Sequence, residues 1–363
     1  MAQDINRAVG QRRRHLDSTT TMPESAPRTF TLASRPSQLA QIQTKSVRAT
    51  LESLFPPSAQ SSPRFETAFM SSAGDRNQSE ALYLLGGKSL WTKDLEVALK
   101  DGKVDMLVHC LKDMPTTLPE GCVIGAILER EDPVDSLVVK AGKDWKSLED
   151  LPSGSVVGTS SVRRIAQLRR NFPELKFLDI RGNLDTRVAK LDAPDGPYAA
   201  LILARAGMVR VGMGARLTAD LSPPNFYYAV AQGALAIEIR SDDAAAMELC
   251  RRLAHRETEW SCLAERACLR VLEGGCSVPV GVATQLNVDA GELHITGCVT
   301  SLDGRIHVEH SLVESVESAE DAERVGARLA AVLMESGGRE ILDEINRDKE
   351  QRVGVAEAAD AAV

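Results

Sequence analysis

Signatures of metal, membrane and nucleotide binding are missing from this sequence of 363 residues. Its seven cysteines form no CxxC pair and no Cys/His pair at metal-ligand spacing, so no metal site is expected. No apolar run approaches the ~20 residues that a membrane-spanning helix needs, so no membrane partner is expected. Neither the GxxxxGK nor the GxGxxG fingerprint occurs, which argues against a nucleotide site.

Aromatic residues make up only 4% of the chain and the net charge is −8, so no general affinity for nucleic acid is expected. The length and the 43% of apolar residues are typical of a globular protein with two or three domains. The first 28 residues lack the apolar core of a secretory signal, and unpaired cysteines suit a reducing compartment. The cytosol is therefore the expected location, with an organellar transit segment as the alternative.

Strands and helices alternate from Thr29 onward. The patterns predict βαβ units in two successive sections, the first with elements over 29–34, 37–54, 92–102 and 104–111. After a helix predicted over 258–275, three alternating runs joined by turn-rich connections indicate an antiparallel meander. A capped helix from Ser318 to about Met334 follows. The chain is thus predicted to be α/β and then α+β.

Positive charge gathers where two predicted strands end, at GTSSVRR (158–164) and IRGNLDTR (180–187). Arg163 and Arg164 fall in the first turn of a helix, where cations oppose the helix dipole, so an anionic ligand is expected beside them. Arginine binds planar carboxylates with two parallel hydrogen bonds, which favours a ligand with several carboxylates. A solvated basic helix face and contacts to nucleic-acid phosphates are the alternatives.

Three further residues are candidates for chemistry. Asp113 follows a buried strand, where a carboxylate can accept hydrogen bonds from a nitrogen ligand or stabilise a cation; a turn aspartate bonded to its own backbone is the alternative. His109 is interpreted as a core residue. Cys276 follows a helix and two glycines, so its thiol is expected to be reachable, although inert burial is the usual state of a cysteine.

Seven motifs together resemble the porphobilinogen deaminase family, also called the hydroxymethylbilane synthases. The resemblance runs from about Phe30 to Ile345, and its motifs occur in order at the spacing of the family. They are SRPSQLAQIQT (34–44), GGKSLWTKDLEVAL (86–99), VHCLKDMPT (108–116), GTSSVRRIAQL (158–168), IRGNLDTR (180–187), AVAQGAL (229–235) and LEGGCSVPVG (272–281).

The resemblance implies a transferase of tetrapyrrole (heme) biosynthesis that joins four porphobilinogen molecules into linear hydroxymethylbilane and releases ammonia. It implies a dipyrromethane cofactor held by a thioether on Cys276, because a soft thiol traps the electrophile left when porphobilinogen loses ammonia. Asp113 matches the catalytic aspartate. A non-catalytic periplasmic-type binding module for a polycarboxylate, or a relative that has lost activity, is the alternative.

The same motifs imply a set of cofactor- and substrate-binding residues. These are Arg35, Ser37, Gln43, Lys88, Lys112, Thr159, Ser160, Ser161, Arg163, Arg164, Arg181, Gly182, Arg187, Arg210 and Gln232. Several residues depart from the family pattern: Cys110 replaces a serine, Arg205 a small or apolar residue, and Ala231 a glycine, while Pro36 is atypical beside Arg35. In the segment 76–84, the polar run RNQSE stands where the family usually has an apolar pair and an aspartate, and Leu84 stands where a lysine is common.

The implied fold has two α/β domains like those of periplasmic binding proteins and a third α+β domain with a three-stranded antiparallel sheet. The expected boundaries are 28–130 with 229–250 for the first domain, 131–228 for the second and 256–346 for the third. Residues 1–27 and 347–363 are expected to be disordered tails. Porphobilinogen is the expected partner, and a monomer the expected state.

Overall fold

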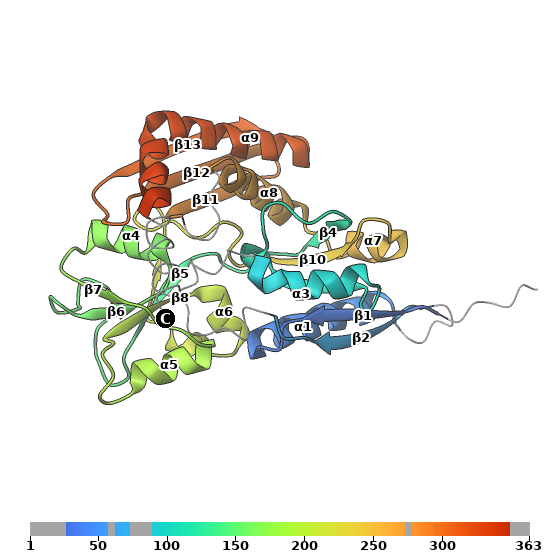
Figure 1. Cartoon of the computed structure of the whole chain (residues 1–363), viewed down its shortest axis with the longest axis horizontal. Coiled ribbons are helices and arrows are strands. Elements are labelled where there is room, and N and C mark those ends of the chain that lie inside the picture. Colours follow the sequence, from blue (N-terminus) through green and yellow to red (C-terminus); the bar gives the residue numbers. More distant parts are fainter. Residues whose placement is uncertain (1–26, 57–61, 73–88, 273–277, 349–363) are drawn as a thin grey trace, which may run out of the picture.

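Three β-sheets organise the chain in the computed structural model, which describes residues 27–56, 62–72, 89–272 and 278–348. Two sheets have five strands and the third has three. Figure 1 shows the two five-stranded sheets side by side, with the three-stranded sheet and its helices lying above them. The mixed α/β architecture with a separate antiparallel sheet confirms the predicted fold class.

The first sheet has the strand order β2-β1-β3-β10-β4. Its strands are β1 (Thr29–Ser34), β2 (Arg64–Phe69), β3 (Met106–Cys110), β4 (Cys122–Ile127) and β10 (Leu235–Arg240), and its helices are α1 (Gln38–Leu54), α3 (Ser89–Lys100) and α7 (Ala244–Arg251). Strand β1 is parallel to β2 and β3, whereas β10 is antiparallel to β3 and β4. Strand β10 comes late in the chain, and it lies against β3, the strand that precedes Asp113.

The second sheet has the strand order β7-β6-β8-β5-β9. Its strands are β5 (Asp135–Val139), β6 (Val156–Gly158), β7 (Lys176–Leu178), β8 (Ala200–Ala204) and β9 (Ala219–Leu221), and its helices are α4 (Val162–Asn171), α5 (Leu184–Asp192) and α6 (Arg205–Arg210). Strand β6 is parallel to both neighbours, but β5 is antiparallel to β8 and β9. Each five-stranded sheet is therefore mixed, because the chain crosses between the sheets after β4 and again before β10.

The third sheet is the antiparallel meander predicted from the alternating runs. Its strands are β11 (Val280–Asn287), β12 (Glu292–Thr300) and β13 (His307–Ser315), and its helices are α8 (Arg256–Val271) and α9 (Ala319–Leu333). Helix α8 ends at Val271, four residues before the predicted end, and residues 339–348 continue helically beyond the short π-helical segment η3 (Met334–Gly338). Residues 347 and 348, expected in a tail, are therefore helical, and the rest of both expected tails, apart from Pro27, lies outside the described residues.

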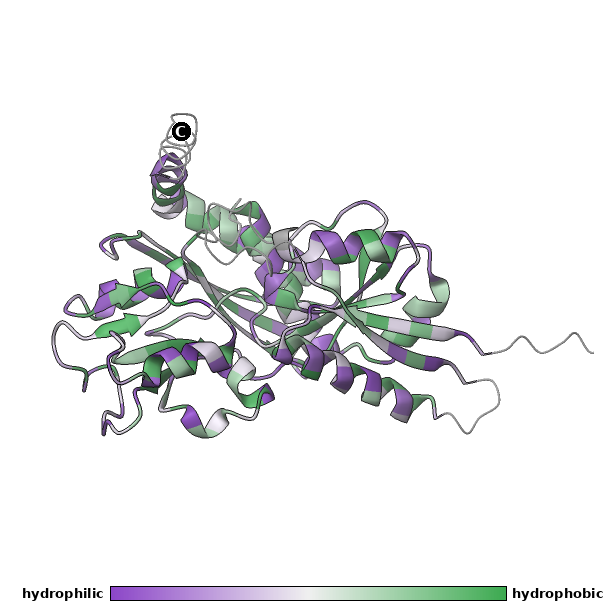
Figure 2. Ribbon diagram, turned by 60° about the horizontal axis from the view of Figure 1, so that its bottom comes forward, coloured by the Kyte–Doolittle hydropathy of each residue, from purple (hydrophilic) through white to green (hydrophobic). Residues whose placement is uncertain are grey.

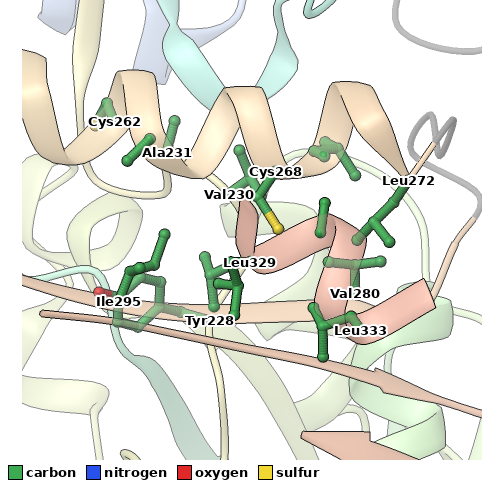
Figure 3. Packing of buried hydrophobic residues seen from close by; sticks show 14 of the residues in the cluster. Tyr228, Val230, Ala231, Cys262, Cys268, Leu272, Val280, Ile295, Leu329 and Leu333 are labelled. Atoms are coloured by element: carbon green, nitrogen blue, oxygen red, sulfur yellow. The ribbon is translucent and has the colours of Figure 1, made fainter. Parts of the chain in front are cut away.

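One continuous apolar cluster joins the third sheet to the first. Side chains of α8, α9 and the connection before β10 pack together in it, as Figure 3 shows for Cys268, Leu329 and Val230. Leu111 and Met114, which flank Asp113 at a distance of one or two residues, belong to the same cluster. Figure 2 shows hydrophobic residues along the central strands and mixed faces on the helices around them. The turn that carries Asp113 is thus packed against α8.

Neither a membrane span nor a metal centre occurs in the described part of the chain. No helix there is long and apolar enough to cross a membrane. No group of three or more His, Cys, Asp or Glu side chains there is arranged to hold a metal ion.

Helices α8 and α9 approach each other closely at Gly326. A Cβ atom built on Gly326 would lie 1.9 Å from the carbonyl oxygen of Ala264 on α8. Because that neighbour is backbone, neither helix can relieve the clash by rotating a side chain. The contact therefore requires glycine.

We expect Gly326→Ala to lower the free energy of unfolding by about 1–3 kcal/mol, because the added methyl group forces the two helices apart. Gly214→Ala is the matched control, since a Cβ there would have only Val209 Cγ2 within 4 Å, at an ordinary van der Waals distance of 3.8 Å. Urea denaturation of the three proteins measures the difference. Equal midpoints for the parent and Gly326→Ala would contradict this account of the contact.

Candidate functional site

A cavity of about 120 Å³ lies between the two five-stranded sheets. Its lining residues come from α1, the end of β3 and the turn after it, helices α4 to α6, β8 and the connection before β10: Leu39, Gln43, Cys110, Lys112, Arg164, Leu184, Arg187, Leu203, Ala204, Ala206, Gly207, Arg210, Gly233 and Ala234. Of these described residues four are cations and none is a carboxylate. The cavity is therefore suited to an anion with several negative groups.

Asp135 is the buried counter-ion of the predicted arginine pair. Its carboxylate is fully buried at the start of β5 and lies 2.8 Å from Arg163 Nη2 and 2.6 Å from Arg164 Nη2. Burial alone would raise the pKa of Asp135, but the two guanidiniums outweigh it and hold this pKa well below its ordinary value. Asp135 thus stays ionised and makes the burial of two cations possible.

The two adjacent arginines have different surroundings. Arg164 lines the cavity and donates hydrogen bonds to Asp135 and to the carbonyl oxygen of Ile202. Arg163 is outside the cavity lining; it donates to Asp135 and, over 2.6 Å, to the carbonyl oxygen of Tyr227. Successive residues of a helix point about 100° apart, so one arginine faces the ligand space and the other braces the connection before β10.

Lys112 and Gln232 extend this network toward Asp113. Lys112 Nζ donates to Gln232 Oε1 over 3.0 Å, and Gln232 Nε2 donates to Asp135 Oδ1 over 2.9 Å. Burial lowers the pKa of Lys112, whereas the adjacent Asp113 carboxylate raises it. A chain of polar contacts therefore runs from the lysine beside Asp113 to the counter-ion of the arginines.

Arg187 and Arg210 complete the cationic wall, and backbone carbonyls orient both. Arg187 Nε donates to the carbonyl oxygen of Gly182 over 2.8 Å, and Arg210 Nη2 donates to that of Gly233 over 2.6 Å. Gly182 has a φ of +113°, which favours glycine. Burial lowers the pKa of Arg187 to about 10, and it also lowers the pKa of Arg210. An anionic ligand would offset this cost of burying positive charge.

Asp113 ends the short helix η1 (Leu111–Asp113) at the carboxyl end of β3. Its side chain is half-buried, and its negative charge contributes a rise to the pKa of Lys112, Arg187 and Cys110. Gln43 Nε2 lies 3.2 Å from the Cys110 sulfur in the cavity wall. The structure thus brings Asp113 close to the cationic cavity.

Other predicted site residues shape the surroundings of the cavity. Ser37 and Ser161 cap the amino ends of α1 and α4. Ser160 Oγ donates to the carbonyl oxygen of Ile180 over 2.8 Å, and Thr159 Oγ1 accepts from the amide of Ser161. Ser37 thus stabilises the turn before α1, and the other three residues stabilise the turn before α4.

The remaining predicted residues lie farther out or beyond the described chain. The Arg35 guanidinium stacks 4.0 Å above the Trp91 ring, and Arg181 lies 3.3 Å from Asp179. Neither lines the cavity. Lys88 and Cys276 lie outside the described residues, as does the segment 76–84.

Three departures from the family pattern have a defined place in the structure. Arg205 pairs with Asp220 over 3.0 Å and does not line the cavity. Ala231 has a φ of +60°, and its amide donates to the buried carboxylate of Glu265 over 2.6 Å. That hydrogen bond holds an alanine in a conformation that favours glycine. Cys110 faces the cavity.

Sequence reasoning missed Asp135 and the apolar wall. Leu39, Leu184 and Leu203 line the cavity beside the cations. A signal for Asp135 was available, because an aspartate opens the strand DSLVV, which ends in three apolar residues, and a charge buried in a sheet requires a partner. No comparable signal marks the leucines, because leucines of helices and of apolar strands usually face a core.

A second hollow, of about 560 Å³, contains Arg169, Arg170 and Arg305. Arg169 and Arg170 occupy the last turn of α4, where cations interact favourably with the helix dipole, and Arg305 lies 3.6 Å from Asp303. These charges have structural explanations, and the hollow contains none of the predicted site residues. The cavity beside Asp113 is the stronger candidate.

The fold and the cavity together define a protein with two α/β units, a cavity between them that arginine and lysine side chains line, and a third, α+β unit. Comparisons with known proteins identify the family. The family model "Porphobilinogen deaminase, dipyromethane cofactor binding domain" matches residues 30–248, and "Porphobilinogen deaminase, C-terminal domain" matches residues 260–335. The chain belongs to the porphobilinogen deaminase family.

Individual relatives agree with this assignment. The chain is 48% identical to the porphobilinogen deaminase of a Nostoc species, over 90% of this chain and 97% of that protein. It is 45% identical to that of Candida albicans, over 87% of this chain and 92% of that protein.

Similar solved structures include the periplasmic aliphatic sulphonate binding protein SsuA of Escherichia coli. It is 14% identical, with a TM-score of 0.34, over 68% of this chain and 76% of that one. The second substrate binding domain of a putative amino acid ABC transporter from Streptococcus pneumoniae has a TM-score of 0.35 at 12% identity, over 66% of this chain and 93% of that one. The architecture described above rests on the strand order of this chain and not on these similarities.

We expect Asp135→Asn to lower the free energy of unfolding by about 3–5 kcal/mol at neutral pH, because two buried guanidiniums lose their counter-ion. The folded-state pKa of Asp135 is depressed, so its stabilisation is present above the unfolded pKa of about 3.9 and is lost as pH falls toward the folded value. Urea denaturation at pH 7 and at lower pH measures this. Asp220→Asn, at the exposed Arg205 pair, is the control and should cost about 1 kcal/mol or less. Equal losses in both variants would contradict the assigned role.

Proposed function

We propose that this protein is the transferase that condenses four porphobilinogen molecules into linear hydroxymethylbilane with release of ammonia. Membership of the porphobilinogen deaminase family carries the proposal. The cationic cavity beside Asp113 supports it, because each pyrrole of the substrate and of the growing chain bears carboxylates. The alternative of a non-catalytic binding module is less supported, since it requires neither Asp113 nor Cys276.

The described residues fit a dipyrromethane cofactor, which the matched family domain binds. Four cations would receive its carboxylates, and the leucine wall would contact the faces of its pyrrole rings. When bound, the cofactor supplies the pyrrole carbon to which the first substrate is joined. Cys276 is the proposed attachment residue.

Asp113 is the proposed catalytic residue. Positive charge develops on the pyrrole nitrogen of the substrate as ammonia leaves, and a fixed carboxylate nearby lowers the energy of that state. The same carboxylate can accept a hydrogen bond from the pyrrole N–H and so orient the ring. Its half-buried position limits the water that would otherwise weaken these interactions.

The cations have a positioning role in this proposal. Lys112, Arg164, Arg187 and Arg210 bind carboxylates of cofactor or substrate directly. Other residues act indirectly, because they hold the side chains that line the cavity: Arg163, Gln232 and the residues at the start of α4. Five further residues remain predicted contacts of cofactor or substrate: Arg35, Ser37, Gln43, Lys88 and Arg181.

Domain boundaries, oligomeric state and location stay predictions. The boundaries are supported by the return of β10 to the first sheet. A monomer is expected from the family resemblance. The cytosol is expected because Cys110, Cys122, Cys250, Cys262, Cys268 and Cys298 are free, as suits a reducing compartment.

Intact mass of the purified, denatured protein tests the proposal first. We expect the parent chain to carry an added mass equal to two pyrrole units less their ammonias, and Cys276→Ala to lack it. Cys110→Ser is the matched control, because Cys110 is a second thiol in the cavity wall and should not change the added mass. A bare polypeptide mass that persists after incubation with porphobilinogen would reject the proposed function.

Asp113→Asn should lower kcat by about 10²-fold or more and leave folding and the bound cofactor intact, because the amide cannot offset developing positive charge. Production of hydroxymethylbilane from porphobilinogen, followed together with thermal unfolding, measures both effects. Asp101→Asn, at an exposed carboxylate paired with Lys103, is the control and should leave kcat unchanged. Retained turnover in Asp113→Asn would overturn the role assigned to Asp113.

A further inference from the structure

Arg266 is a buried arginine on helix α8. Only 3% of its surface is exposed, and among the described residues its guanidinium contacts two backbone carbonyl oxygens and no carboxylate. Burial lowers its pKa to about 10. A buried charge without a counter-ion is costly, so a structural or functional requirement must offset the cost.

The guanidinium of Arg266 reaches the turn that carries Asp113. Its Nη2 donates to the carbonyl oxygen of Pro115 over 2.7 Å, and its Nη1 lies 3.5 Å from that of Met114. The first is a good hydrogen bond and the second a weak one. The carbonyl groups that follow Asp113 are thus held from α8, across the contact between the first and third sheets.

The other side of this turn is held by the connection before β10. The amide of Leu111 donates to the carbonyl oxygen of Ala234 over 3.0 Å, and Lys112 donates to Gln232. The chain is therefore held on both sides of Asp113: the connection before β10 contacts residues 111 and 112, and Arg266 contacts residues 114 and 115. After Asp113, Met114 also packs in the apolar cluster, and its amide donates to the carbonyl oxygen of Leu111 over 3.2 Å.

Helix α8 also leads directly to the proposed cofactor-attachment residue. Arg266 lies five residues before Val271, where the helix ends, or about 8 Å along its axis. Cys276 follows five residues later in the sequence. The same rigid helix thus holds the aspartate turn through Arg266 and carries the chain that leads to the cysteine.

We propose that Arg266 is a positioning residue that fixes the Asp113 turn relative to the helix leading to the cofactor thiol. This inference rests on the proposed function. Small displacements of a reacting group can lower rates by ~10²-fold, so a hydrogen bond from α8 to the Asp113 turn affects turnover without touching substrate. Arg266 would thereby act on kcat more than on binding.

Three variants test the inference. Arg266→Met should keep the fold and the cofactor mass, lower kcat about tenfold or more, and change KM less than about threefold. Amide hydrogen exchange over residues 111–115 should become faster than in the parent. Arg266→Lys keeps a hydrogen-bond donor, so its kcat and its exchange rate should lie between those of the parent and of Arg266→Met. Arg270→Met, one turn along α8 at the exposed pair with Glu323, is the matched control and should change neither kcat nor exchange.

A kcat within about twofold of the parent, or a lower kcat without faster exchange at 111–115, would overturn the inference. If Arg266→Met does not fold, Arg266→Lys decides: exchange that quickens mainly at 111–115 supports the role, and unchanged or uniformly faster exchange rejects it. A parent protein that forms no hydroxymethylbilane would reject the proposed function instead. Amide exchange would then still show whether Arg266 holds the turn.

Discussion

Burial of positive charge is the constraint on which the rest of this structure depends. An anion-binding cavity needs cations that are removed from water, and each of these must be held by a partner that stays in place when no ligand is bound. Asp135 does this for two arginines, while backbone carbonyls do it for Arg187 and Arg210. The resulting cations are oriented in advance, so a polycarboxylate ligand need not order them.

The same constraint explains how the three sheets are joined. Glu265 on α8 accepts hydrogen bonds from Arg130, which follows β4, and from the amide of Ala231 before β10, and Thr284 of β11 donates to it as well. Arg163 donates to the carbonyl oxygen of Tyr227, which lies in the same connection before β10 as Ala231. Buried charges therefore lie at both crossings between the five-stranded sheets, where backbone groups without strand partners would otherwise be left unpaired. The crossings that build the cavity are also the places where its charges are satisfied.

Residue types and spacing predicted which residues are candidates for the site, because their chemistry is visible in the sequence. Arginines in the first turn of a helix oppose the dipole, and this local conflict indicated an anion before any tertiary contact was known. The antiparallel meander was likewise predicted from alternation and turn residues, which are local signals. The separate roles of Arg163 and Arg164 were not predictable, because both contact Asp135, which lies 28 and 29 residues earlier in the chain, and their directions depend on how α4 packs.

The sequence by itself determined the family, the α/β and α+β sections and the residue types of the site, because these follow from motifs and from periodicities of a few residues. Only the tertiary structure decided which cations face the cavity, that Arg205 pairs with Asp220 instead, and that Arg266 holds the Asp113 turn. The physical reason is distance along the chain. Asp135, Gln232 and Arg266 meet their partners across as many as 152 residues, and such pairings depend on how sheets and helices pack rather than on local sequence.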